Sequence, residues 1–200
     1  MNPPSFSAEI AAAAARLVVE DGMEYGPAKR KAAQLLGRRT TRSTALPDNE
    51  AVEDEVRAYL ELFHADTQPV ELAALREVAA QWMERLAEYR PHLTGAVWRG
   101  TATRLDPVHL QLFCDDSKAA EITLIDRGIS YEVDSGHGPR GEPVDRLILT
   151  TSCAVLGKRV TLCLTILDHD DLRGLLRPDA RGRTQRGDLA ALRRLMQAAP

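Results

Sequence analysis

The period of the sequence changes at Val108-His109-Leu110-Gln111-Leu112-Phe113, where apolar and polar side chains alternate. Alternation with a period of two is typical of a strand that buries one face. The same pattern returns in Val160-Thr161-Leu162-Cys163-Leu164-Thr165-Ile166-Leu167. With residues 146–155 before it and a turn near Gly157, this second stretch forms a hairpin. The second half of the chain is therefore predicted to contain a β-sheet.

We predict a mixed sheet of about five strands from Gly95 to Asp168, with one helix crossing between its second and third strands. The strands are expected at residues 95–99, 108–113, 129–133, 146–155 and 160–167, and the helix at residues 117–127. Residues 134–145 are expected to form a loop. The core is expected to hold Trp82, Leu86, Val108, Leu110, Leu112, Ile122, Ile125, Leu162, Leu164 and Ile166.

Before His92, apolar residues instead recur at steps of three and four, as Val52, Val56 and Leu60 do. This spacing predicts amphipathic helices. The fold class is therefore α+β, with an N-terminal helical subdomain at residues 1–66. A second domain, residues 67–200, contains the sheet and an Arg-rich C-terminal tail.

Composition excludes several classes of protein. The net charge of −3 and the 28% of charged residues indicate no general affinity for nucleic acid. No apolar run approaches the roughly 18 to 20 residues that cross a bilayer, so no membrane association is expected. The three cysteines, Cys114, Cys153 and Cys163, have no paired spacing. Such a set favours reduced thiols and a bacterial-type cytoplasm.

One stretch resembles the polymerase-beta-type nucleotidyltransferases. Gly95-Ala96-Val97-Trp98-Arg99-Gly100 precedes the strand 108–113, and those enzymes have a Gly-Ser or Gly-Gly turn, a second Gly, and then a strand with two carboxylates at alternate positions. The order of helices and strands is also similar over about a hundred C-terminal residues. Together with the N-terminal helices, this half looks like an uncharacterised bacterial family with a nucleotidyltransferase-like label.

The resemblance implies a ligand site, but the residues that would hold Mg²⁺ are missing. Where a carboxylate pair is required, the chain has His109 and Gln111, or Asp106 and Val108 in the other register, and neither is such a pair. Ala96 replaces the Ser of the turn. Neutral side chains do not suit a hard dication, so no cofactor and no metal are expected. The ligand-binding candidates are Gly95, Arg99, Gly100, His109, Gln111, Thr161 and Cys163.

An active enzyme remains an alternative, and it would use Asp106, Asp115 and Asp116 as catalytic acids with Mg²⁺. Asp115 and Asp116 have a second interpretation, because acidic residues also end strands and favour the start of the helix that follows. A face of His109, Gln111, Thr161 and Cys163 has a second interpretation too, as the exposed side of a half-covered sheet.

The strongest local charge is basic. Six cations without an acid lie between Pro27 and Arg42: Lys29, Arg30, Lys31, Arg38, Arg39 and Arg42. They either contact phosphate or RNA, or pair with the acidic helix that follows. The arginines of the tail are candidates to extend such a surface if they fold beside it: Arg173, Arg177, Arg181, Arg183 and Arg186, against Asp179.

Three functions follow from these patterns. The first is a catalytically degenerate nucleotidyltransferase-like protein that binds a nucleotide-like ligand, RNA or a protein partner. The second is the active metal-dependent enzyme. The third is a helical dimerisation or interaction module, such as a homodimer, without a small-molecule site.

Overall fold

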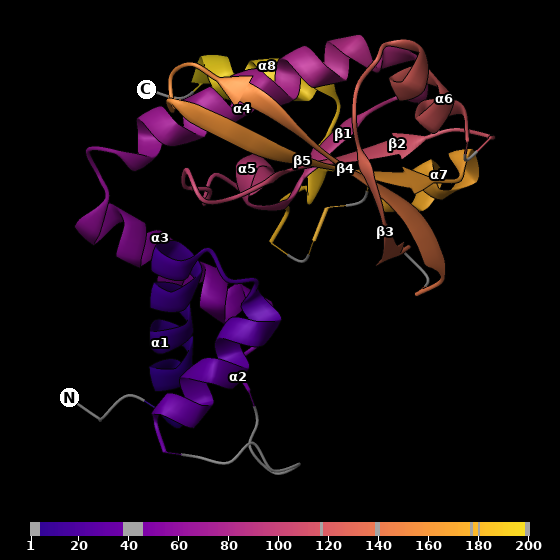
Figure 1. The fold of residues 1–200 in the computed structure, drawn as a ribbon. Helices are drawn as coiled ribbons and strands as arrows, with labels where there is room; N and C mark the ends of the chain where they lie inside the picture. The colour runs from indigo at the N-terminus through magenta and orange to yellow at the C-terminus, as the bar shows by residue number, and fades with distance from the viewer. Residues whose placement is uncertain are drawn as a thin grey trace. The chain divides into compact units, whose positions relative to one another are not determined.

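The chain forms helices first and a six-stranded mixed sheet second, which confirms the predicted α+β class (Figure 1). The computed structural model describes residues 5–37, 46–116, 118–138, 141–176, 178–179 and 181–198. The chain divides into two units, Met1–Pro69 and Val70–Pro200. Within the described ranges, no helix has the length and apolar character that crossing a membrane requires.

The first unit is built from α1 (Phe6–Asp21), α2 (Tyr25–Leu35) and α3 (Asn49–Phe63). Side chains cap two of these helices: Ser5 accepts a hydrogen bond from the Ala8 amide and Asp48 from the Ala51 amide. Such caps satisfy backbone donors that the first turn leaves unpaired. The apolar stripes of the three helices then form one core of their own, which includes Ile10, Ala14, Ala28, Ala32, Val52 and Val56.

The sheet of the second unit has the order β3-β4-β5-β2-β1-β6. Its strands are β1 (His92–Thr94), β2 (Val108–Phe113), β3 (Glu132–His137), β4 (Pro143–Cys153), β5 (Lys158–Leu167) and β6 (Arg186–Gly187). Only β2 and β5 are parallel to each other, and all other neighbours are antiparallel. Because parallel neighbours need a crossover, the chain between them contains a helix and the hairpin of β3 and β4.

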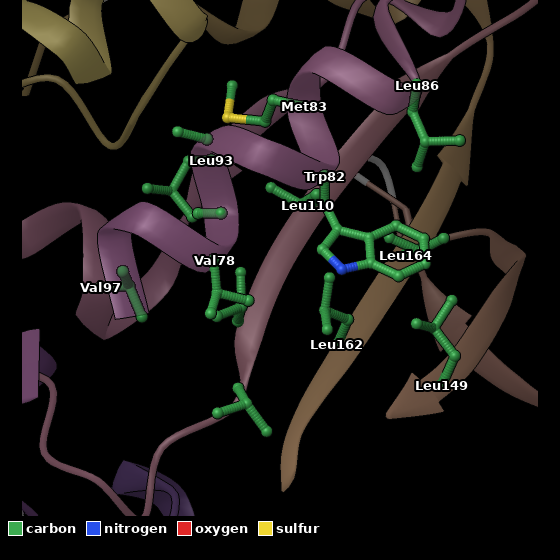
Figure 2. Packing of buried hydrophobic residues seen from close by; sticks show 14 of the residues in the cluster. Val78, Trp82, Met83, Leu86, Leu93, Val97, Leu110, Leu149, Leu162 and Leu164 are labelled. Atoms are coloured by element: carbon green, nitrogen blue, oxygen red, sulfur yellow. The ribbon is translucent and has the colours of Figure 1, made fainter. Parts of the chain in front are cut away.

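The helices of this unit are α4 (Gln68–Arg85), α5 (Gly95–Arg99), α6 (Ala119–Asp126), α7 (Leu172–Leu175) and α8 (Leu189–Ala198), with 3-10 turns at Ala87–Tyr89 and His169–Asp171. Helices α4, α6 and α8 contribute side chains to a core with one face of the sheet, the inner face (Figure 1). Figure 2 shows Trp82 of α4 beside Leu162 and Leu164 of β5. The alternation of β2 and β5 therefore assigns the faces correctly.

Residues 95–99 are a helix, so the strand predicted there is wrong. The first strand is the shorter β1, directly before Gly95, and β6 in the tail was not predicted at all. Gly95 has a φ of +76°, which turns the chain out of β1 and into α5. Val97 is fully buried in the core while the residues around it are half-buried. Five residues are too few for the apolar pattern to separate a strand from a single helical turn.

Ile122 and Ile125 are also not in the core, contrary to the prediction. They are 52% and 59% exposed, whereas Ala120 and Leu124 of the same helix are fully buried. Apolar side chains occur on most sides of this short helix, so its sequence does not determine which side is buried. The third strand begins at Glu132 rather than Ile129. The expected loop 134–145 is too long, because residues 134–137 belong to β3 and residues 143–145 to β4. The other predicted core residues are buried.

Replacing Leu110 or Leu164 by Ala should lower the free energy of unfolding by about 2–5 kcal/mol, because each side chain is fully buried between the sheet and its helices. Urea denaturation followed by circular dichroism measures the change. Leu105→Ala is the matched control, because Leu105 is 47% exposed. A loss at Leu110 or Leu164 no larger than the loss at Leu105 would contradict the assignment of faces.

Candidate functional site

Polar side chains of neighbouring strands lie together on the face of the sheet opposite α4, which we call the outer face. The register of the parallel pair places His109 beside Cys163 and Gln111 beside Thr165. The antiparallel pair β4 and β5 adds Thr150 beside Thr161. Residues directly across two strands point to the same side. The structure thus brings together four of the predicted ligand-binding residues: His109, Gln111, Thr161 and Cys163.

Gly95 belongs to the same site because it contacts His109. A Cβ atom at Gly95 would lie 3.2 Å from Cδ2 of His109, so the imidazole packs directly on the backbone at the start of α5. Gly100 lies elsewhere. A Cβ atom there would meet Arg76 and Leu72 of α4, which covers the inner face. Gly100 therefore contributes a turn at the end of α5, with a φ of +83°, rather than a surface of the outer face.

Arg186 completes the outer face, and the predicted ligand-binding set did not include it. Thr94 of β1 is in register with His109 of β2 and with Arg186 of β6, so all three share one face. The Arg186 side chain crosses β1, because its Nη1 donates a hydrogen bond of 2.6 Å to Oε1 of Gln111 on β2. Burial lowers the pKa of Arg186 below its usual value.

The segment before β6 is held in place by the side chains of β1 and α5. Trp98 Nε1 donates a 2.7 Å hydrogen bond to the Thr184 carbonyl, and Thr94 Oγ1 donates one of 2.9 Å to the Gln185 carbonyl. Gly187 lies under the Trp98 ring, where a Cβ atom would be 2.1 Å from the nearest ring carbon. These contacts fix the backbone from which Arg186 reaches across the sheet.

Asp106 closes the turn that leads into β2. Its Oδ2 accepts hydrogen bonds from the Thr103 amide at 2.8 Å and from the Thr103 hydroxyl at 3.2 Å. Burial raises the pKa of Asp106, and the bonds from Thr103 and the charge of Arg99 oppose that rise. Arg99 therefore lies near this turn. The geometry gives Asp106 a role in shaping the turn.

Asp115 and Asp116 lie at the other end of β2, so the three candidate acids do not form one site. Six residues of strand separate the two ends by on the order of 20 Å. Asp116 Oδ1 accepts a 2.9 Å hydrogen bond from the Lys118 amide, directly before α6, as the helix-start interpretation predicts. Asp115 lines a cavity of about 400 Å³ at the ends of β2, β4 and β5, with Cys114, Asp145 and Asp168.

The surroundings of the Cys114 thiol, which lines this cavity, disfavour its thiolate form. Burial and the charges of Asp116, Asp115 and Asp168 all raise its pKa, and a thiol with a raised pKa is a poor nucleophile. Among the residues that the structure describes, no three His, Cys, Asp or Glu side chains are placed to hold a metal ion together.

The basic candidates belong to the helical unit, and two of them make contacts within it. Lys29 Nζ donates hydrogen bonds to the Pro47 carbonyl at 3.0 Å and to Asn49 Oδ1 at 2.8 Å. Lys31 Nζ lies 3.1 Å from Asp21 Oδ2. Arg30 is exposed, and Arg38, Arg39 and Arg42 lie outside the described residues. Lys29 thus bonds neutral oxygens, and Lys31 pairs with an acid of α1 rather than with the acidic helix α3 that follows the cluster.

Sequence patterns had no means of selecting Arg186 from the other tail arginines. Strand β6 has two residues, too few for alternation to appear, and its partner β1 lies about ninety residues earlier in the chain. The nearest signal is Gly187, which follows Arg186 in an otherwise Arg-rich tail and marks a close approach to another group.

Replacing Gly187 by Ala should destabilise the protein by about 1–3 kcal/mol, because the added methyl group overlaps the Trp98 ring. The emission of Trp98 should change as well. Gly136→Ala in β3 is the matched control, because the nearest atom to its Cβ position is 3.6 Å away. Equal stability of the two variants in denaturant unfolding would show that Trp98 does not rest on Gly187.

Asp106→Asn should change how stability depends on pH. The folded state raises the pKa of Asp106, so folding favours the protonated form. Its contribution is therefore most favourable below the ordinary pKa of about 3.8 and declines as pH rises through the raised value. The free energy of unfolding of the wild type, minus that of the Asn variant, should fall over this window.

The Asn variant keeps an oxygen for the Thr103 amide, whereas Asp106→Ala removes both hydrogen bonds. The Ala variant should therefore lose about 1–3 kcal/mol at every pH. Urea unfolding between pH 3 and pH 8 gives all three curves. Parallel curves for the wild type and the Asn variant would show that Asp106 has an ordinary pKa.

Comparisons with known proteins give no relative for this geometry. No family model matches the chain, and no curated protein or solved structure shows significant similarity to it.

Proposed function

We propose that the protein is a catalytically degenerate nucleotidyltransferase-like protein that binds a nucleotide-like ligand on the outer face of its sheet. The observation that carries this proposal is the hydrogen bond from Arg186 to Gln111, beside His109. It places a half-buried cation among neutral polar side chains. Such a surface suits an anionic ligand that also offers groups for hydrogen bonding.

The order of the elements around this contact supports the resemblance to nucleotidyltransferases. A short strand, β1, ends at a glycine with positive φ, a helical turn follows, and β2 then pairs antiparallel with β1. This is the order expected from the family's glycine turn and the strand that follows it. His109 and Gln111 lie on β2 at the two alternate positions where a carboxylate pair would stand.

The same contact disfavours metal-dependent catalysis. The guanidinium of Arg186 donates to Gln111, so a dication at this position would meet a positive charge and a neutral amide. Two-metal phosphoryl transfer depends on carboxylates that hold Mg²⁺ and place it on the phosphates. The enzyme alternative would have to join Asp106 with Asp115 and Asp116, which lie at opposite ends of β2.

A small ligand is favoured over RNA because of where the cations lie. Lys29 and Lys31 are used in contacts within the helical unit, whereas Arg186 lies on the outer face of the sheet. Cys114, Cys153 and Cys163 form no disulfide within the described residues, which suits a reducing compartment such as a bacterial cytoplasm. We include that location in the proposal.

Thermal denaturation with nucleoside triphosphates, with and without Mg²⁺, tests the proposal. We expect the melting temperature to rise to the same extent in both conditions, because binding of a ligand to the folded state alone stabilises it. A rise that requires Mg²⁺ would contradict the proposal. The absence of any rise would favour the interaction module, which has no small-molecule site.

Labelled triphosphates with Mg²⁺ or Mn²⁺ and a range of RNA and protein acceptors test for catalysis. We expect no transfer above background. Asp106→Ala, Asp115→Ala and Asp116→Ala serve as controls for a contaminating enzyme, whose activity would persist in all three. Transfer that disappears in any one of these variants would establish the enzyme alternative.

A further inference from the structure

Arg186 differs from Arg146 and Arg183 in its charge environment. Arg146 lies on the same face of the sheet and pairs with Asp134. Arg183, three residues before β6 begins, pairs with Asp179. Arg186 instead faces Gln111, which offers a neutral oxygen. Within the described ranges, no carboxylate forms an ion pair with Arg186. A half-buried cation without a counter-charge is unfavourable until an anion reaches it.

One donor of this side chain is also unused. Nε of Arg186 is buried, and none of the described residues accepts a hydrogen bond from it. A buried donor without a partner costs free energy that a bound acceptor would recover. The guanidinium therefore lacks both a counter-charge and an acceptor for one of its donors among the described residues.

The surroundings of Arg186 indicate the class of anion. The neighbouring side chains on the outer face are a hydroxyl, an amide and an imidazole, from Thr94, Gln111 and His109. Thr165 adds a hydroxyl beside Gln111. The Thr94 hydroxyl already donates to the Gln185 carbonyl, whereas an amide, an imidazole and the Thr165 hydroxyl are groups of a kind that donates hydrogen bonds to an anion. A guanidinium beside such groups matches the several oxygens of a phosphate, and the planar fork of an arginine binds two of them at once.

We infer that Arg186 is the phosphate-binding residue of the outer face, and that it binds the phosphate of the ligand without a metal ion. This inference rests on the proposed function and specifies how the ligand is held. The segment 184–187 supplies the arginine, and the contacts of Trp98 and Thr94 with that segment position it.

Isothermal titration of the full chain with ATP, pyrophosphate and adenosine, all in EDTA, tests this inference. ATP and pyrophosphate should bind to the wild type. Arg186→Gln should weaken both by about 10- to 100-fold, the effect of losing hydrogen bonds to a charged group. The affinity of Arg186→Lys should lie between that of the wild type and that of Arg186→Gln, because lysine keeps the positive charge but lacks the planar fork of two donors. Arg194→Gln, an exposed arginine of α8, is the matched control and should bind as the wild type does.

Gln111→Glu gives a second test that does not depend on removing Arg186. The new carboxylate would supply the missing counter-charge within 2.6 Å of the guanidinium, at the position of the amide oxygen. The melting temperature should therefore rise while pyrophosphate binding is lost. A variant that is only misfolded would lose stability and binding together. Binding that persists in Gln111→Glu with raised stability would overturn the inference.

The outcomes separate this inference from the proposed function. ATP binding that is unchanged in Arg186→Gln would overturn the inference and leave the nucleotide proposal in place. Pyrophosphate binding that depends on Arg186, with ATP no tighter than pyrophosphate and no binding of adenosine, would support the phosphate site and contradict nucleotide recognition. No binding of either phosphate compound to the wild type would overturn both.

Discussion

The parallel pairing of β2 with β5 is the constraint on which the rest of the sheet unit depends. It joins segments about fifty residues apart, so the chain between them must leave the sheet as α6 and return as the β3–β4 hairpin. Both strands turn leucines toward α4 and polar residues away from it. Burial of the leucines thus also determines which side chains share the outer face.

The positive charge beside Gln111 on the outer face comes from β6, the strand at the edge of the sheet next to β1. Strand β1 lies between β2 and β6, so a long side chain on β6 must cross β1 to reach Gln111. Only an extended side chain such as that of Arg186 spans this width. The position of its charge depends in turn on the close packing of Trp98 over Gly187, where no larger residue fits. Packing at the sheet edge therefore determines where the charge of Arg186 lies on the outer face.

The acids of the chain illustrate how a residue type alone misleads. Asp106 accepts a hydrogen bond from the backbone amide of Thr103, and Asp116 accepts one from that of Lys118. Local hydrogen bonds of this kind are the usual reason for Asp in turns and before helices. Asp115 instead lines a cavity at the far end of β2. A catalytic set needs side chains that converge on one point, and the length of a strand keeps these apart.

The sequence by itself determined the fold class, the inner and outer faces of β2 and β5, and the meeting of His109, Gln111, Thr161 and Cys163. Alternation over six to eight residues is enough to specify which side of a strand is buried. It did not determine the conformation of residues 95–99, the buried side of α6, or the place of Arg186. Residues 95–99 and β6 are short, and α6 has apolar side chains on most of its sides, so the local sequence is compatible with more than one conformation or buried face. Only the tertiary structure decided among them, because the contacts that select one arrangement come from strands and helices distant in the chain.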